Sequence, residues 1–223
     1  LFEDGGFVVI RGDIEKNAIL RLPIYKFRPS QGDPLHFDLW HKGVNILVDG
    51  GTYSYASNSK DIDYFGGIES HNTVQFGNNQ PMPRLSKFLL GDWLKLNYPL
   101  SIKEIESKIE ISASYKCKYG SHSRRIIFRE KGKKIIIVDS ISSINNKSTI
   151  RWRLANLEWK KSDNIFKSNK AIIEVEKNNF LQDFFISDGY KSTEYSQKMK
   201  IPVLEIKVYG KDAIIRTKIE LLN

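Results

Sequence analysis

The sequence LHFDLW at residues 35–40 alternates apolar and polar side chains, which is the two-residue period of a β-strand with one buried face. The pair Lys42-Gly43 follows as a turn signal, and VNILV at residues 44–48 is a second short apolar run. Two such runs joined by a short turn predict antiparallel strands. The second run ends at Asp49-Gly50-Gly51, where the glycines allow the backbone to turn sharply.

The same alternation recurs along most of the chain. Further strands are predicted at residues 7–10, 18–25, 72–76, 93–96, 109–116, 124–129, 134–140, 148–154, 171–175, 203–209 and 213–221. No window sustains a helical stripe, and the irregular stretch 56–70 and the polar stretch 183–202 are expected to be loops. The pattern predicts an all-β fold, a large antiparallel two-sheet β-sandwich (a supersandwich), as one domain over residues 1–223.

Composition narrows the class of protein. The chain has 223 residues, 35 Lys and Arg against 26 Asp and Glu, a formal net charge of +9 and a single cysteine. The cysteine count excludes a disulfide framework and a CxxC zinc ribbon, and the apolar runs are too short for a membrane span. The charge favours nucleic acid, acidic polysaccharide or a phospholipid surface. No nucleic-acid motif is present, and the lysines of the second half are scattered through turns.

Two histidines and an aspartate could hold a metal ion. His36 lies on the face opposite the core, Asp49 ends the next strand, and His71 begins the run HNTVQF. Two imidazoles and a carboxylate leave a fourth position open, as zinc commonly has where three protein ligands bind it. The alternative is histidines hydrogen-bonded inside the sandwich. The chain has two further histidines. His41 is expected to be exposed in a turn and to have no role, and His122 is expected to orient a sheet edge.

Three motifs, in this order, resemble one protein family. They are GDPLHFDL at residues 32–39, LVDGGTYSY at 47–55 and SHNTV at 70–74. Together they resemble the C-terminal domain of the heparinase II/III-like polysaccharide lyases, and FEDGGFVV at 2–9, SHSRR at 121–125 and IVD at 137–139 match less distinctively. The resemblance implies an antiparallel β-sandwich that accompanies an N-terminal (α/α) toroid, and cleavage of acidic polysaccharide by β-elimination. It also implies a structural zinc bound by His36, Asp49 and His71.

The resemblance further implies that this chain is the sandwich without its toroid. The absence of an initial Met and of a signal segment agrees with a piece of a longer polypeptide. The family's principal tyrosine base and an Asn/His pair lie on the toroid, so we expect the 223 residues alone to lack lyase activity. A bacterial protein of this kind is expected to be periplasmic or secreted.

One position departs from the family pattern. The lyases often read His-x-His-x-Asp, where the first histidine helps to neutralise or contact the uronate, and that position is Pro34 here. A proline side chain carries no titratable group and donates no hydrogen bond, so that role is lost. The departure favours a second hypothesis, a non-catalytic carbohydrate-binding or polysaccharide-assembly module from a capsule or envelope locus.

Five residues near the predicted metal loops are candidates for contact with substrate. Tyr53 and Tyr55 are candidates for catalysis, and Arg28, Gln31 and Arg84 for substrate binding. The alternatives are ordinary strand packing for one of the tyrosines and a solvated loop charge for Arg84.

Overall fold

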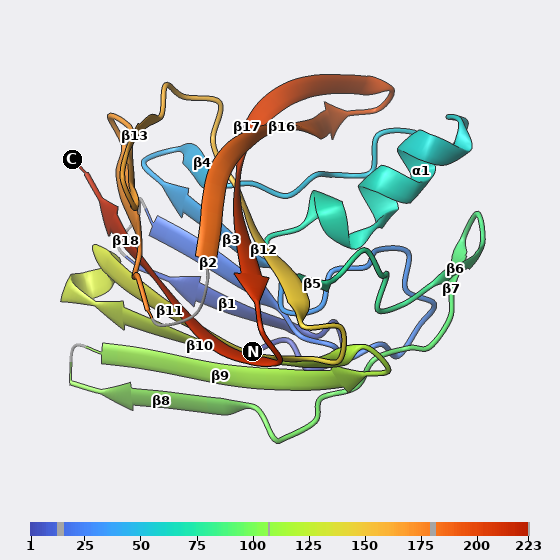
Figure 1. Ribbon diagram of the computed structural model, residues 1–223, viewed down its shortest axis with the longest axis horizontal. Helices are drawn as coiled ribbons and strands as arrows, with labels where there is room; N and C mark the ends of the chain where they lie inside the picture. Colours follow the sequence, from blue (N-terminus) through green and yellow to red (C-terminus); the bar gives the residue numbers. More distant parts are fainter. Residues whose placement is uncertain (13–15, 107, 179–181, 223) are drawn as a thin grey trace.

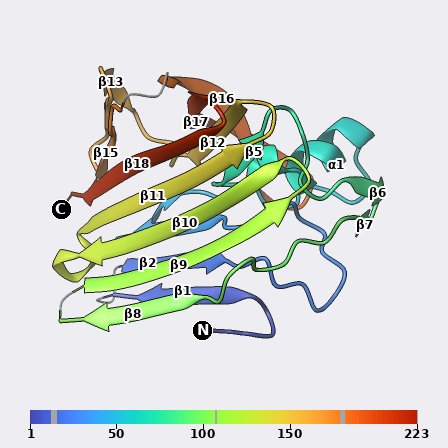
Figure 2. The ribbon, with the colours of Figure 1, turned by 60° about the horizontal axis from the view of Figure 1, so that its bottom comes forward.

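The computed structural model describes residues 1–12, 16–106, 108–178 and 182–222 of the chain. Its strands form two layers packed face to face (Figure 1, Figure 2). One layer, the large sheet, has the strand order β13-β14-β15-β18-β11-β10-β9-β8. Its strands are β8 (Ser101–Ile105), β9 (Lys108–Cys117), β10 (Gly120–Arg129), β11 (Lys134–Ser143), β13 (Lys160–Ser162), β14 (Ile165–Lys167), β15 (Ala171–Val175) and β18 (Asp212–Leu221).

The other layer consists of two smaller sheets, with the orders β1-β2-β3-β4 and β16-β17-β12-β5. Their strands are β1 (Phe7–Arg11), β2 (Lys16–Arg21), β3 (Phe37–His41), β4 (Val44–Leu47), β5 (Val74–Phe76), β12 (Lys147–Arg153), β16 (Gln182–Glu194) and β17 (Gln197–Tyr209). The two sheets join where Leu47 forms a β-bridge with Leu154 and the Val48 amide donates to the Arg153 carbonyl at 2.8 Å. The predicted antiparallel sandwich is confirmed.

The space between the layers is filled by the inward-facing residues of the strands. These residues form a hydrophobic cluster that includes positions from Val8 to Leu221, and the rings of Phe37 and Phe128 meet across it at 6.2 Å. Burying each large apolar side chain contributes roughly 1.5–3 kcal/mol. The core therefore provides a rigid support for the loops at the ends of β3, β4 and β5.

Residues 56–70 contain a helix, where the sequence predicted a loop. α1 (Ser59–Gly66) is followed by the 3-10 turn η1 (Ile68–Ser70), and a second 3-10 turn, η2 (Glu130–Gly132), joins β10 to β11. The side chain of Asn58 caps α1 by accepting a hydrogen bond from the Asp61 amide at 2.9 Å. Within α1 only the last two residues are buried. Two turns with so few apolar residues show no helical stripe.

The predicted loop at residues 183–202 is also wrong, because these residues belong to the β16–β17 hairpin. β12 pairs with β17 only from Val203 to Tyr209, so the preceding half of β17 pairs with β16 alone. The first four residues of β17 are exposed. A strand with no buried face needs no apolar alternation, and this segment therefore reads as polar.

Smaller differences have similar causes. Residues 93–96 form no strand, and Leu96 makes an isolated bridge to Tyr115. The strand predicted at 18–25 ends at Arg21, after which the Leu22 amide donates to the Gly6 carbonyl at 2.7 Å. Short or polar strands escaped prediction, namely β8, β13, β14 and the two-stranded sheet of β6 (Arg84–Ser86) and β7 (Leu89–Leu90).

Candidate functional site

His36, Asp49 and His71 lie together between the ends of three segments of the smaller layer. Asp49 Oδ2 lies 2.8 Å from His71 Nδ1 and 3.4 Å from His36 Nε2. One ligand atom from each residue lies within 4.8 Å of the others. Both histidines are buried, whereas the Asp49 side chain is 39% exposed. The three residues singled out in the sequence therefore form one cluster that opens to solvent at Asp49.

The approach of the Asp49 loop to the His71 segment depends on Gly50. A Cβ atom at this position would lie 2.5 Å from Ser70 Cβ and 2.8 Å from the Ser70 carbonyl oxygen. The Gly50 amide instead donates to that oxygen at 2.9 Å. Gly51, at φ +75°, donates its amide to Asp49 Oδ1 at 2.6 Å and so orients the carboxylate.

Asn72, the residue after His71, ties the ligand segments to one another. Its side-chain amide donates to the carbonyls of Phe37 at 3.0 Å and Val48 at 3.3 Å, which adjoin the other two candidate ligands. Its backbone amide donates to His36 Nδ1 at 2.9 Å. The sequence reasoning missed this role, although Asn72 stands inside the SHNTV motif.

Ser70 lies against the ring nitrogen of His71 that does not face Asp49. The Ser70 hydroxyl has one proton and two acceptors within reach, the carbonyls of Phe65 at 2.8 Å and Gly67 at 3.0 Å. Its oxygen can therefore accept a hydrogen bond from His71 Nε2, 3.2 Å away. In a neutral ring this leaves the Nδ1 lone pair directed at the Asp49 carboxylate. Either a cation between the two atoms or a proton on Nδ1 makes that arrangement favourable.

The electrostatics keep His36 neutral and Asp49 ionised. Burial lowers the pKa of His36 to about 3. Because His36 Nδ1 accepts the Asn72 amide, the proton of the neutral ring lies on Nε2, which faces Asp49. Burial raises the pKa of Asp49, but His71 and His36 outweigh this effect and hold the pKa below its usual range. An ionised carboxylate between two imidazoles can accept hydrogen bonds or bind a metal ion.

The two separations at Asp49 are close to those of a tetrahedral zinc ion with three protein ligands. With bonds of about 2.0–2.1 Å, neighbouring ligand atoms of a tetrahedral site lie about 3.3 Å apart, compared with 2.8 and 3.4 Å around Asp49 Oδ2. The exposed side of Asp49 leaves a fourth position toward solvent. Binding at His36 Nε2 moves the ring proton to Nδ1, so the Asn72 amide needs another acceptor. Without a metal, the same residues form a hydrogen-bonded network, which is the alternative that the sequence left open.

The two remaining histidines are buried. His41 is 2% exposed and its Nε2 lies 2.8 Å from the Leu222 carbonyl, so the prediction of an exposed residue is wrong. β3 extends through His41, and the end of the chain covers it. His122 lies on the inner face of β10, a central strand, and its Nε2 is 2.7 Å from Asp139 Oδ1. It therefore orients a buried carboxylate rather than a sheet edge.

A small hollow brings together three of the five residues predicted to contact substrate. Gln31, Tyr55 and Arg84 line it, together with Thr52 and Phe88. Gln31 Nε2 donates to Thr52 Oγ1 at 3.4 Å. Gln31 Oε1 is buried and has no hydrogen-bond partner within the described part of the chain.

Arg84 is held in place rather than free in solvent. Its Nε lies 3.1 Å from an Asp63 carboxylate oxygen. Nη1 donates to the Lys87 carbonyl at 3.0 Å and Nη2 to the Ile62 carbonyl at 3.3 Å. The reading of Arg84 as a solvated loop charge is therefore wrong.

Tyr53 and Arg28 lie outside this hollow. The Tyr53 ring stacks on Phe65 at 5.2 Å, and Lys198 Nζ lies 5.0 Å from the Tyr53 ring centroid. Arg28 is exposed and lines a neighbouring hollow, to which Gln31 also contributes. Tyr53 packs on the Phe65 ring, although it lies outside the strands in which such packing was expected.

Two aromatic residues that the sequence did not single out flank Tyr55. The ring centroid of Tyr55 is 5.8 Å from that of Phe88 and 6.2 Å from that of Tyr195. Phe88 comes from the β6–β7 turn and Tyr195 from the tip of the β16–β17 hairpin, so no local motif links them. The three rings, 49–61% exposed, form an aromatic patch of the kind that marks binding surfaces.

Pro34 is buried beside the cluster, and its carbonyl accepts a hydrogen bond from Thr73 Oγ1 at 2.5 Å. Its ring supplies neither a donor nor a titratable group at the place where the resemblance expects a histidine.

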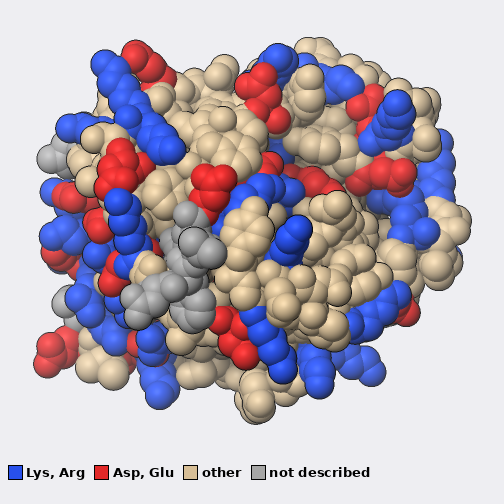
Figure 3. Space-filling model, in the orientation of Figure 1, with Lys and Arg blue, Asp and Glu red and all other residues tan. Residues whose placement is uncertain are grey.

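Basic residues are spread over the surface. Figure 3 shows Lys and Arg across the visible face, interleaved with Asp and Glu. This distribution agrees with the scatter along the sequence and favours no single cationic groove for an anionic polysaccharide on that face.

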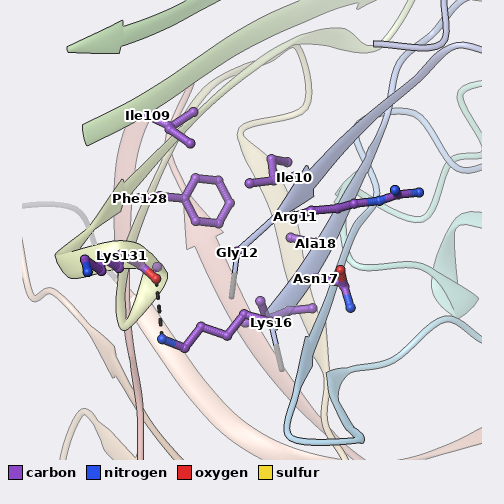
Figure 4. A pocket seen from close by; sticks show the side chains of 11 residues that line it. Ile10, Arg11, Gly12, Lys16, Asn17, Ala18, Ile109, Phe128 and Lys131 are labelled. Carbon is purple, nitrogen blue, oxygen red and sulfur yellow. Dashed lines mark hydrogen bonds between the residues drawn. The ribbon is translucent and has the colours of Figure 1, made fainter. Parts of the chain in front are cut away.

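A larger hollow of about 340 Å³ opens elsewhere, between β1, β2 and the large sheet (Figure 4). Ile10, Ala18 and Phe128 line it, and Lys16 Nζ donates to the Lys131 carbonyl at 3.4 Å (Figure 4). None of the candidate site residues lies among its described lining residues.

Comparisons with solved structures agree with the fold. A heparinase III gene product superposes with a TM-score of 0.83 at 17% identity, covering 100% of this chain and 36% of that protein. The heparan sulfate lyase HepC from Pedobacter heparinus gives 0.80 at 16%, covering 99% and 36%. A further heparinase III structure gives 0.76 at 19%, covering 100% and 36%. No curated protein sequence matches.

The chain therefore spans about a third of the length of the solved proteins that it resembles. In the part of the chain that the structure describes, no helix has the length and apolar character needed to cross a membrane. The family model for the heparinase II/III-like C-terminal domain matches residues 1–202. The chain belongs to this family, and its sandwich is the heparinase II/III-like C-terminal domain.

Proposed function

We propose that this chain is the C-terminal domain of a polysaccharide lyase that cleaves acidic polysaccharide by β-elimination. In this proposal the sandwich packs on an N-terminal (α/α) toroid of the same polypeptide and forms one side of the substrate cleft. A zinc ion bound by His36, Asp49 and His71 has a structural role. The observation that carries the proposal is the convergence of these three side chains around Asp49 Oδ2 in a member of this family.

Zinc at this cluster would link segments that are separate in the sequence. The proposed ligands come from the residue before β3, the loop after β4 and the segment before β5. Metal bonds among them would order the loop that carries Thr52 and Tyr55, which line the hollow beside Arg84. When bound, the ion supplies a cross-link between loops rather than a reacting group.

The proposed substrate contacts follow from the chemistry of β-elimination. The reaction needs neutralisation of the uronate carboxylate, a base that removes the C5 proton and an acid that protonates the leaving oxygen. Arg84 offers a guanidinium fixed in place by Asp63, Gln31 a side-chain amide at the hollow, and Tyr55 a phenol and an exposed ring. Arg28 would contact the chain of the polysaccharide at the neighbouring hollow. Pro34 cannot neutralise a carboxylate, so the remaining groups must come from the toroid.

The first test is therefore an activity comparison. The 223 residues alone should not release unsaturated uronate from heparin, heparan sulfate or alginate, as measured by absorbance of the new double bond. The full-length polypeptide should release it from at least one acidic polysaccharide. Turnover by the isolated chain would contradict the assignment of the base to the toroid.

A second candidate function is favoured by Pro34. A non-catalytic carbohydrate-binding or polysaccharide-assembly module needs the aromatic patch but no histidine at this position. An upstream helical region with a tyrosine and an Asn-His pair in the full-length gene supports the enzyme, and its absence supports the module. In both cases we expect a periplasmic or secreted location in a bacterium, which cell fractionation would test.

A further inference from the structure

Arg124 is a fully buried guanidinium whose orientation is fixed by its neighbours. It lies on β10 directly opposite Asp139 of β11 and is 0% exposed. Its Nε donates to Asp139 Oδ1 at 2.7 Å and its Nη2 to Oδ2 at 3.1 Å. The ring of Trp152 lies 4.7 Å from Arg124 Cζ. A bidentate carboxylate and an aromatic ring leave this group one orientation.

The remaining nitrogen of Arg124 reaches the opposite layer of the sandwich. Nη1 donates to the carbonyls of Leu35 and Asn72, each at 2.6 Å. These two residues directly neighbour His36 and His71 in the chain. One nitrogen atom therefore holds the backbone of both histidine segments.

The two segments depend on such support in different ways. Leu35 has φ +56°, a left-handed conformation that a residue with a side chain adopts only where its surroundings hold it. Asn72 already bonds to Phe37, Val48 and His36 Nδ1. A shift of either carbonyl away from Arg124 would therefore change the spacing of the candidate ligands.

We propose that Arg124 is a positioning residue for the metal centre, which fixes the separation of His36 and His71 so that both imidazoles face one zinc ion. The proposal rests on the zinc site proposed above. Asp139 acts through Arg124 by orienting its guanidinium, and His122 in turn bonds to Asp139. A lysine cannot replace this arrangement, because a single ammonium group does not form the planar fork.

The test compares two Arg→Lys variants of the full 223-residue chain. Arg124→Lys should weaken zinc binding at least tenfold, measured by competition with a chromophoric chelator. It should also change the visible absorption of bound Co²⁺, which reports ligand geometry. Arg151→Lys is the matched control, because Arg151 is also buried and bonds to Gln75 and Glu205, which do not adjoin a ligand. It should lower thermal stability but keep the zinc Kd within about threefold of wild type.

The outcomes separate this proposal from the zinc site itself. If Arg124→Lys loses stability like the control but keeps the wild-type Kd and Co²⁺ spectrum, Arg124 is purely structural and the proposal is wrong. If the wild-type chain binds no zinc, the metal site fails and the positioning role fails with it. Should Arg124→Lys not fold, Asp139→Asn serves instead. It should weaken zinc binding about tenfold, and a Kd within about threefold of wild type would overturn the proposal.

Discussion

At the residue scale, the centre of the site is one oxygen atom, Asp49 Oδ2, which faces an imidazole nitrogen on either side. The two imidazoles are not equivalent. His36 is neutral, with a pKa lowered by burial, whereas His71 is oriented by Ser70. This difference leads to separate predictions for protons and for metal.

The first prediction concerns pH. The pKa of His36 is about 3 in the folded chain and 6.5 ordinarily, so the unfolded chain takes up a proton that the folded chain does not. The contribution of His36 to the free energy of unfolding of the metal-free chain should therefore fall as the pH drops from 6.5 toward 3, while Asp38, whose pKa burial raises to about 7, opposes that fall. The pKa of Asp139 is lowered to about 2, so Asp139 adds to the loss only below about 3.8. Urea unfolding across this range should show a shallower decline for His36→Gln, by up to about 1.4 kcal/mol per pH unit. Equal slopes would contradict the buried, neutral His36.

The second prediction concerns the orientation of His71. Ser70→Ala removes the hydroxyl that lies 3.2 Å from His71 Nε2 and should weaken zinc binding about tenfold, because the partner of a ligating histidine fixes its tautomer. Ser57→Ala is a suitable control, since that hydroxyl bonds only locally to the Ser54 carbonyl. Equal zinc affinities in the two variants would show that Ser70 does not act on the metal site.

The sequence allowed the candidate ligands to be predicted, because their residue types and motif are visible in it. Their partners were not predictable. Asn72 and Arg124 act through the carbonyls of residues distant in sequence, and such contacts exist only after the layers have packed. Phe88 and Tyr195 were not predicted for the same reason, since they and Tyr55 come from three segments that are separate in the sequence.

At the element scale, alternation predicted the strands that have one buried and one exposed face, such as β18. It failed where that condition does not hold. Residues 197–200 of β17 have no buried face, and α1 buries too little to show a stripe. Both elements border the site. The tip of the hairpin holds the loop that follows Asp49. The Ser192 amide donates to the Gly50 carbonyl and the Ser196 amide to the Tyr53 carbonyl, both at 2.8 Å.

A third prediction tests the contact between the Asp49 loop and the η1 segment. Gly50→Ala places a methyl group 2.5 Å from Ser70 Cβ, so the two segments must separate. We expect a loss of about 1–3 kcal/mol in the free energy of unfolding and weaker zinc binding. Gly43→Ala is the matched control, because a Cβ there meets nothing within 4 Å. Its positive φ should cost about 1 kcal/mol, without a change in zinc affinity. Unfolding and zinc titrations of both variants would show whether the close approach matters.

At the scale of the whole molecule, a sandwich with an extensive core supports a cluster built from loops of one layer. The fold does not require zinc, because the hydrophobic cluster extends through both layers. Zinc should therefore add to stability rather than create it. Saturation at one hundred times the Kd should raise the free energy of unfolding by about 2.7 kcal/mol, measured by urea unfolding with zinc and with a chelator. Unfolding of the chain by the chelator alone would contradict this account.

The most direct test of the account is the zinc content and zinc affinity of the purified chain, measured beside those of His36→Ala. The account predicts about one zinc ion per wild-type chain, bound through three protein ligands. It also predicts loss of that ion in His36→Ala, with a lower melting temperature. A metal-free wild-type chain that does not bind added zinc, or a His36→Ala variant that binds zinc as tightly as wild type, would contradict it.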